Sequence, residues 1–131
     1  MFSNFVTQKV LDCYLNKQTI TPPSALYFAL MNTDPTPANT GIEVSGSGYS
    51  RVPITGLTYA QLVSGKMTVS NTARITLPEA TGNWTEANYW AIYDAQTGGN
   101  LITYEALATK ATVLAGQQPK VEVGGLVVTL V

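Results

Sequence analysis

The regular return of turn-forming residues constrains the fold of this chain most. From residue 24 onward, short runs rich in apolar and β-branched residues alternate with segments rich in Gly, Pro, Asn and Asp. Runs of about four to eight residues match strands better than helices. Turn signals about every ten residues are typical of antiparallel β-sandwiches and barrels, whereas long helical patterns between strands would indicate a parallel sheet. We therefore predict a mainly β chain.

The expected fold class is an antiparallel β-sandwich, jelly-roll or immunoglobulin-like in outline, with one N-terminal amphipathic helix. Seven or eight strands are expected, and the candidates are SALYFALM (24–31), YSRVPI (49–54), MTVSN (67–71), ARITLP (73–78), NYWAIYD (88–94), LITYEALA (101–108), KVEV (120–123) and LVVTLV (126–131). The 131 residues fit one domain over 1–131, since no linker divides them and no internal repeat is visible.

Residues 3–16 are the one segment with a convincing helical pattern. Its apolar residues recur at spacings of three and four and form one stripe: Phe2, Phe5, Val6, Val10, Cys13 and Tyr14. Ser3 suits the N-cap, because its hydroxyl can accept a hydrogen bond from an unpaired backbone N–H. The strand at 24–31 is apolar on both faces and needs cover on each, so we expect the helix stripe to pack over it.

The segment 32–48, NTDPTPANTGIEVSGSG, is a long stretch of turn-forming residues. Gly46 and Gly48 raise the question of a phosphate-binding loop. Such a loop needs a following helix and a Lys-Ser/Thr pair, and the sequence has neither here. The alternative is an arm that takes part in assembly. Long loops without regular structure are usually functional or disordered, so we expect this one to be mobile in the isolated protein and ordered in the assembly.

Residues suited to catalysis or metal binding are scarce. The chain has no histidine, the commonest general base and metal ligand. Its single cysteine, Cys13, cannot form an internal disulfide or a Cys-based zinc site. Four carboxylates in the second half could include a glycosidase pair: Glu79, Glu86, Asp94 and Glu105. Asp94 is also a typical turn residue, however, and Glu105 can simply face solvent. We predict no enzyme, no metal and no cofactor.

The charge of the chain argues against nucleic acid and membrane partners. Seven basic and eight acidic residues give a net charge of −1, with no basic block, whereas nucleic acid and anionic membranes attract clustered Lys and Arg. No apolar run approaches the ~20 residues of a membrane-spanning helix. The N-terminus lacks the order of a signal peptide, so we expect synthesis in a reducing cytoplasm.

Aromatic residues gather in the second half of the chain and have three interpretations. On strands they pack in a core, anchor a protein interface or stack on a sugar ring. The candidate interface comprises these aromatics together with residues of the glycine-rich loop and the strand after it: Trp84, Tyr89, Trp90, Tyr93, Tyr104, Gly46, Gly48 and Tyr49.

Five motifs, in order, resemble those of a family of small tailed-bacteriophage virion proteins usually labelled phage tail fibre proteins. They are SNFVTQKVLDCYL, ALYFALMNTDPTPANTGIEVSGSGYSRVPI, ITLPEATGNW, WAIYDAQTGGNLITYEAL and the closing V-x-AG…V-x-VGGLVVTL. The resemblance covers essentially the whole chain and departs at Thr85, where the family often has glycine. It implies a particle-associated structural protein without a catalytic or metal motif, made in the cytoplasm of a bacterial host.

The resemblance leaves the position in the virion open. We favour a non-enzymatic capsid decoration (cement) protein on the particle exterior, because a fibre shaft needs repeats or heptads for reach and the sequence shows neither. The alternative is a tail-fibre or baseplate component that binds the host receptor. A third hypothesis is a carbohydrate-binding module that recognises a host-surface glycan through Trp84 and Trp90.

The segment LVVTLV at 126–131 suggests subunit contacts. It carries no charged side chain and no proline, so as a free edge strand it would pair with other chains. It is therefore either central in its sheet or shielded at a subunit contact. Charged residues make up only 11% of the chain, against about 25% in an ordinary domain. We expect a homo-oligomer that contacts other virion proteins, with the hairpin at 89–104 near the contact, and the resemblance suggests a trimer.

Overall fold

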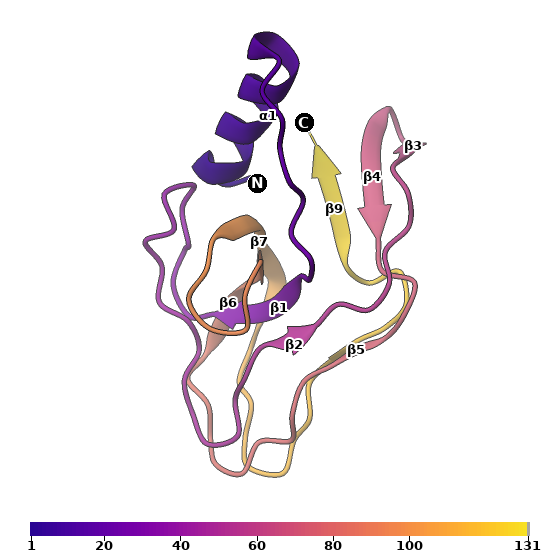
Figure 1. Cartoon of the computed structure of the whole chain (residues 1–131). Coiled ribbons are helices and arrows are strands. Elements are labelled where there is room, and N and C mark those ends of the chain that lie inside the picture. Colours follow the sequence, from indigo (N-terminus) through magenta and orange to yellow (C-terminus); the bar gives the residue numbers. More distant parts are fainter. Residues whose placement is uncertain (131) are drawn as a thin grey trace.

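A computed structural model describes residues 1–130, which are mainly β with one helix near the N-terminus (Figure 1). The elements are α1 (Asn4–Asn16), β1 (Tyr27–Met31), β2 (Val52–Pro53), β3 (Gln61–Val63), β4 (Lys66–Ser70), β5 (Ile75–Thr76), β6 (Ala87–Tyr93), β7 (Leu101–Ala111), β8 (Lys120–Val121) and β9 (Val127–Leu130). The paired strands are antiparallel. The predicted class, antiparallel β with an N-terminal helix, is confirmed. Within residues 1–130, no helix has the length and apolar character needed to cross a membrane.

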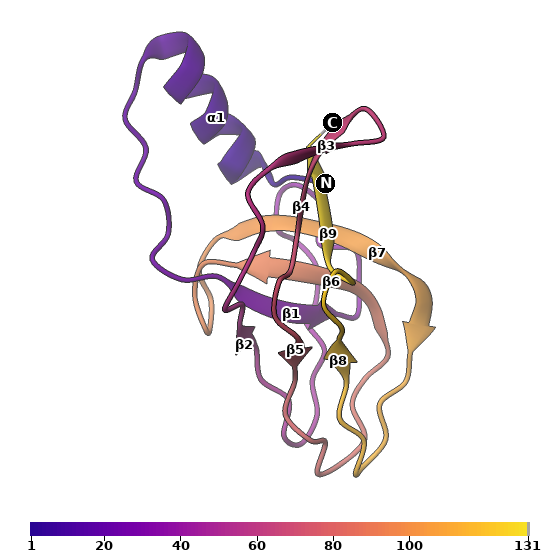
Figure 2. The same cartoon turned by 90° about the vertical axis from the view of Figure 1, so that its right-hand side faces the viewer.

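Two layers of strands build the body of the molecule. The first is a four-stranded sheet in the order β2-β1-β6-β7, and the second combines the three-stranded sheet β3-β4-β9 with the short pair β5-β8. The strands of the two layers run crosswise (Figure 2), as in orthogonal sheet packing. The larger core lies between them and contains Phe28, Leu30, Val44, Ile75, Leu77, Ala80, Trp84, Ala87, Ile92, Val113 and Leu126.

Strand β1 occupies the centre of the four-stranded sheet. It pairs with β2 on one edge and with β6 on the other. Phe28 and Leu30 enter the core between the layers, whereas Ala29 and Met31 point to the opposite face of the sheet. There they form a second core with Ala91, Tyr93, Leu101 and Tyr104. The strand that the sequence shows as apolar on both faces is therefore buried on both.

The first part of the loop at 32–48 lies over this second core, whereas Val44 enters the core between the layers. The backbone N–H of Asn32 donates to the Ile42 carbonyl at 2.8 Å, and Pro35 is less than 2% exposed. The Tyr93 hydroxyl, which belongs to the second core, donates to the Asn39 side-chain oxygen at 2.7 Å. These contacts make the loop a packed part of the fold, and its mobility in the isolated protein stays a prediction.

Helix α1 does not pack over the strand at 24–31, which corrects that prediction. Ser3 caps the helix as expected, with its Oγ accepting from the Val6 N–H at 3.2 Å. The Ser3 N–H donates to the Ile102 carbonyl of β7 at 3.0 Å and ties the start of the helix to the sheet edge. No residue of α1 is buried, and Tyr14 is 80% exposed. The physical reason is that the loop already covers the face that the helix was expected to fill.

Strand β9 lies at the edge of its sheet, so the central position considered for the C-terminal segment is wrong. It pairs with β4 alone, for example through Met67 and Leu130. Val127 and Leu130 are 47% and 56% exposed. Val131, the last residue of the predicted strand, lies outside the described residues. Within residues 1–130, one edge of this apolar strand is therefore unpaired.

Candidate functional site

Three of the aromatic residues predicted at an interface are core residues in the structure. Trp84, Tyr93 and Tyr104 are 4%, 4% and 7% exposed. Trp90 is half-buried and stacks on Phe28, with ring centroids 6.5 Å apart and planes 18° from parallel. Of the interpretations that the sequence left open, packing accounts for these contacts, and little of their surface remains for a partner.

Gly46 and Gly48 allow close approach of the loop to the segment around Trp84. The Trp84 indole N–H donates to the Ser47 carbonyl at 2.9 Å. A Cβ on Gly46 would lie 2.5 Å from the Trp84 ring, and a Cβ on Gly48, where φ is 87°, would lie 2.7 Å from the Glu79 carbonyl oxygen. Neither spacing admits a side chain. The two glycines are explained by packing, without a phosphate.

The rest of the aromatic set is divided between the two cores. Tyr49 packs edge-on against Trp84 at a centroid distance of 5.3 Å. Its ring reaches the backbone of β1, where the Leu30 N–H donates to the Tyr49 hydroxyl at 3.1 Å. Tyr89 is half-buried against the second core. A sugar platform needs an open ring face, and Trp84 has none.

The Arg51 side chain donates four hydrogen bonds. It is 7% exposed and donates from Nε and Nη2 to the two carboxylate oxygens of Glu43, at 3.0 Å each. Its Nη1 donates to the Ala95 and Gly98 carbonyls in the β6–β7 turn, at 2.9 and 2.8 Å. The guanidinium lies over the Tyr93 ring, 3.8 Å from the centroid. One side chain thus joins the loop, the start of β2 and the hairpin.

A cavity of about 380 Å³ lies beside this network. Its walls come from the loop, the strand after it and the β6–β7 turn: Glu43, Val44, Ser45, Gly46, Tyr49, Ser50, Arg51, Gln96, Thr97 and Gly98. The charged groups in it are already paired with each other, and within residues 1–130 every buried side-chain nitrogen and oxygen has a hydrogen-bond partner. The two charged residues that line the cavity, Glu43 and Arg51, are therefore engaged in contacts that hold the fold together.

Three of the four carboxylates considered for catalysis make separate structural contacts. Asp94 accepts from the Asn100 N–H at 2.7 Å and closes the β6–β7 turn. Glu86 pairs with Lys110 at 3.6 Å, and Glu105 pairs with the N-terminal amine. Glu79 is exposed. In the described part of the chain, no group of three His, Cys, Asp or Glu residues could hold a metal ion.

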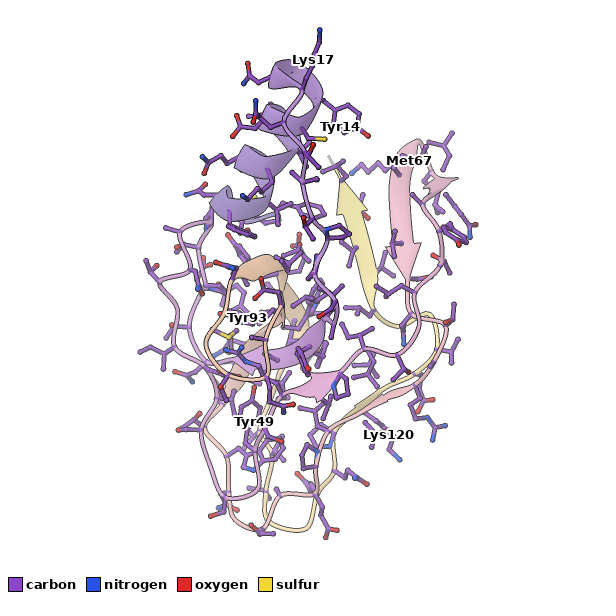
Figure 3. All side chains as sticks on the ribbon, in the orientation of Figure 1. Tyr14, Lys17, Tyr49, Met67, Tyr93 and Lys120 are labelled. Atoms are coloured by element: carbon purple, nitrogen blue, oxygen red, sulfur yellow. The ribbon has the colours of Figure 1, made fainter. Side chains whose placement is uncertain are left out.

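The most exposed apolar surface lies at one end of the molecule, on α1 and the β3-β4-β9 sheet. Figure 3 shows Tyr14 of α1 and Met67 of β4 at this same end. We call this surface the apolar end and define it by ten side chains that are 38–80% exposed: Phe5, Val10, Leu11, Tyr14, Leu15, Leu62, Val63, Met67, Val127 and Leu130. Single exposed apolar residues are ordinary, but a large contiguous group marks an interaction surface.

The class of molecule so far is an antiparallel β domain with an exposed apolar end. The family model described as podophage GP4 fiber I protein gp80 matches residues 1–129. The chain belongs to this family, and so to the structural proteins of phage virions. The resemblance noted in the sequence is confirmed. No curated protein sequence matches the chain.

The sequence did not identify two parts of this arrangement. Arg51 stands between apolar neighbours in YSRVPI, and a charge in a predicted strand is the signal that could have marked a buried ion pair. Leu62, Met67 and Leu130 come from separate strands, and their proximity depends on the strand register, which the sequence pattern does not specify.

Replacing Arg51 with Met tests the buried network. It leaves two turn carbonyls without their donor and the Glu43 carboxylate with the Tyr49 hydroxyl alone, so we expect a loss of about 3 kcal/mol in the free energy of unfolding. The matched control is Arg74→Met, which breaks the exposed pair with Glu122 and should cost less than about 1 kcal/mol. Urea denaturation measures both, and equal losses would contradict the structural role of Arg51.

The pH dependence of stability tests the Tyr49 contact. Burial, and then the hydrogen bond to Glu43 at 2.5 Å, raise the pKa of Tyr49 far above its ordinary value of 10.0. Below pH 10 the phenol is neutral in both states. Above pH 10 the unfolded chain loses this proton and the folded chain keeps it, so stability falls by up to about 1.4 kcal/mol per pH unit for this group.

Tyr49→Phe should therefore be less stable at pH 7, through the lost hydrogen bond, and lose less stability than the wild type between pH 10 and 12. Tyr59→Phe is the control, because Tyr59 is 95% exposed. Urea titrations at each pH give the slopes. The same slope for Tyr49→Phe and the wild type would mean that Tyr49 ionises as easily in the folded chain as in the unfolded one.

Proposed function

We propose that this protein is a non-enzymatic component of a phage tail fibre. The observation that carries the proposal is the match of a podophage fibre family over residues 1–129. The description of that family favours the tail-fibre alternative over the capsid decoration that the sequence led us to prefer. The absence of repeats and heptads still argues against a shaft, so we infer a compact module that joins parts of the fibre or attaches it to the virion.

The side-chain arrangement supports a structural role. The carboxylates of a hypothetical hydrolase close a turn, pair with Lys110 or pair with the N-terminal amine. Trp84, one of the two tryptophans considered for glycan binding, is buried in the core, so a host-surface glycan has no platform there. The principal partners are other virion proteins and further copies of the chain, which we infer are made in the host cytoplasm.

Labelling of intact particles tests the fibre assignment. Gold-conjugated antibodies raised against this chain should decorate the tail region in electron micrographs of purified phage. An antibody against the major capsid protein serves as the control and should label the head. Gold spread over the capsid faces would overturn the fibre assignment and restore the decoration hypothesis.

The proposed oligomer is a homotrimer, and its mass is directly measurable. The apolar end would be exposed to water in a single copy, which favours closed assembly. Sedimentation equilibrium of the purified protein at micromolar concentration should give three times the chain mass of 14.0 kDa. A soluble species of one chain mass over that range would contradict self-assembly.

A further inference from the structure

We propose that the subunit contact is formed by α1 of one copy lying on the bare face of the β3-β4-β9 sheet of the next copy. This inference rests on the proposed assembly function and names its surface. It concerns the apolar end, where a helix and a sheet face are both left without cover.

The register of the three-stranded sheet brings its exposed apolar residues into one row. Leu62 of β3 is opposite Met67 of β4, and Met67 is opposite Leu130 of β9. Residues directly opposite each other point to the same face, and these three are 70%, 52% and 56% exposed. The next row points to the other face and is polar: Gln61, Thr68 and Thr129.

The same sheet face contributes to the core further along the strands. Val69 and Val128 are opposite each other, two residues from Met67 and Leu130, and Val128 packs against the core between the layers. This face is therefore a core-forming face that extends beyond the core it helps to build. The exposed part of this face is apolar like the core, but no second layer among the described residues packs on it.

Helix α1 lies next to the row but leaves a groove. Leu130 shares a groove of about 320 Å³ with side chains of the helix and the residues before it: Phe2, Val6, Thr7, Val10 and Leu11. The start of the helix is held in place, because the Ser3 N–H donates to Ile102 and the Asn4 N–H donates to Pro37. The far end projects from the body (Figure 2), with Tyr14 and Leu15 80% and 73% exposed.

The apolar end is larger than an ordinary surface patch. Val63 and Val127 point to the polar face of the sheet, by the alternation of strand side chains, and the other eight side chains are roughly half exposed. At on the order of 150–200 Å² for a large side chain, these eight offer about 700–900 Å², against about 300–600 Å² for the largest apolar patch of an ordinary monomer. In a ring each copy would bury this area in two contacts, one through its helix and one through its sheet.

A second copy fits this surface better than an unrelated partner. A helix packed on a sheet is a standard way to bury both apolar faces, and each copy supplies one bare helix and one bare sheet face. Their lengths agree: 13 helical residues span about 20 Å and the five residues of β4 span about 17 Å. No charged residue lines the groove, so it does not select a charged partner.

A contact of this kind can join the copies into a closed ring. The helix of one copy meets the sheet of another, so the two surfaces in contact are different, and a contact of this kind generates a ring when the rotation closes. Three copies would bury three helices and three sheet faces and would leave no bare apolar end.

Cysteine cross-linking between two differently tagged chains tests the contact. Both chains carry Cys13→Ser, which removes the native thiol. One also carries Leu15→Cys on α1, and the other Met67→Cys on β4. After co-expression and mild oxidation, we expect a disulfide-linked species that contains both tags. The matched control replaces Met67→Cys with Leu114→Cys, which is 46% exposed in the turn between β7 and β8, and should give no such species.

Two further results separate the outcomes. A chain with both Leu15→Cys and Met67→Cys that cross-links only within itself would show that α1 closes on its own sheet, which overturns the proposal. A trimer by sedimentation without the mixed cross-link would overturn this contact but leave self-assembly standing.

Leu15→Asp should raise the dissociation constant of the trimer at least about tenfold, with an unchanged circular dichroism spectrum because Leu15 is exposed in the single copy. An unchanged dissociation constant would also overturn the proposal.

Discussion

The packing of β1 on both of its faces is the constraint on which the rest of the structure depends. All five of its residues pair with β6, and Tyr27 and Phe28 also pair with β2 on the other edge. Its side chains enter two separate cores. A strand buried in this way needs a separate covering layer on each face. Here the second strand layer covers one face, and the first part of the loop at 32–48 covers the other.

The loop can act as a layer because polar contacts fix it. Arg51 joins the loop at Glu43 to the β6–β7 turn and lies over the Tyr93 ring. Removing one member would leave buried groups without partners. The stability lost in that way is larger than the stability that the pair itself contributes. Because the loop fills this place, α1 does not cover β1. The exposed helix and the bare β3-β4-β9 face therefore follow from how the core is closed, and both remain for contacts between chains.

The sequence was sufficient for the element types and insufficient for their partners. The 3.6-residue pattern and Ser3 placed α1 correctly, and the double apolar pattern of 24–31 identified a strand buried on both sides. An apolar pattern shows that a face is covered, but it does not show by what. A loop rich in Pro and Gly gives no periodic signal. The pattern therefore indicates the helix as the element that covers the second face of the strand at 24–31. The aromatics were ambiguous for the same reason, since Trp84 and Tyr93 could have served a core or an interface equally well. The row of Leu62, Met67 and Leu130 depends on strand register across more than sixty residues of chain, for example Met67 with Leu130.

A reconstruction of the phage tail by electron cryomicroscopy, at a resolution that shows side chains, tests the central claim most directly. We expect copies of this chain in a fibre, with α1 of each copy against the β3-β4-β9 face of its neighbour and Met67 and Leu15 buried between them. Copies placed on the capsid, or copies whose apolar ends face solvent, would contradict it.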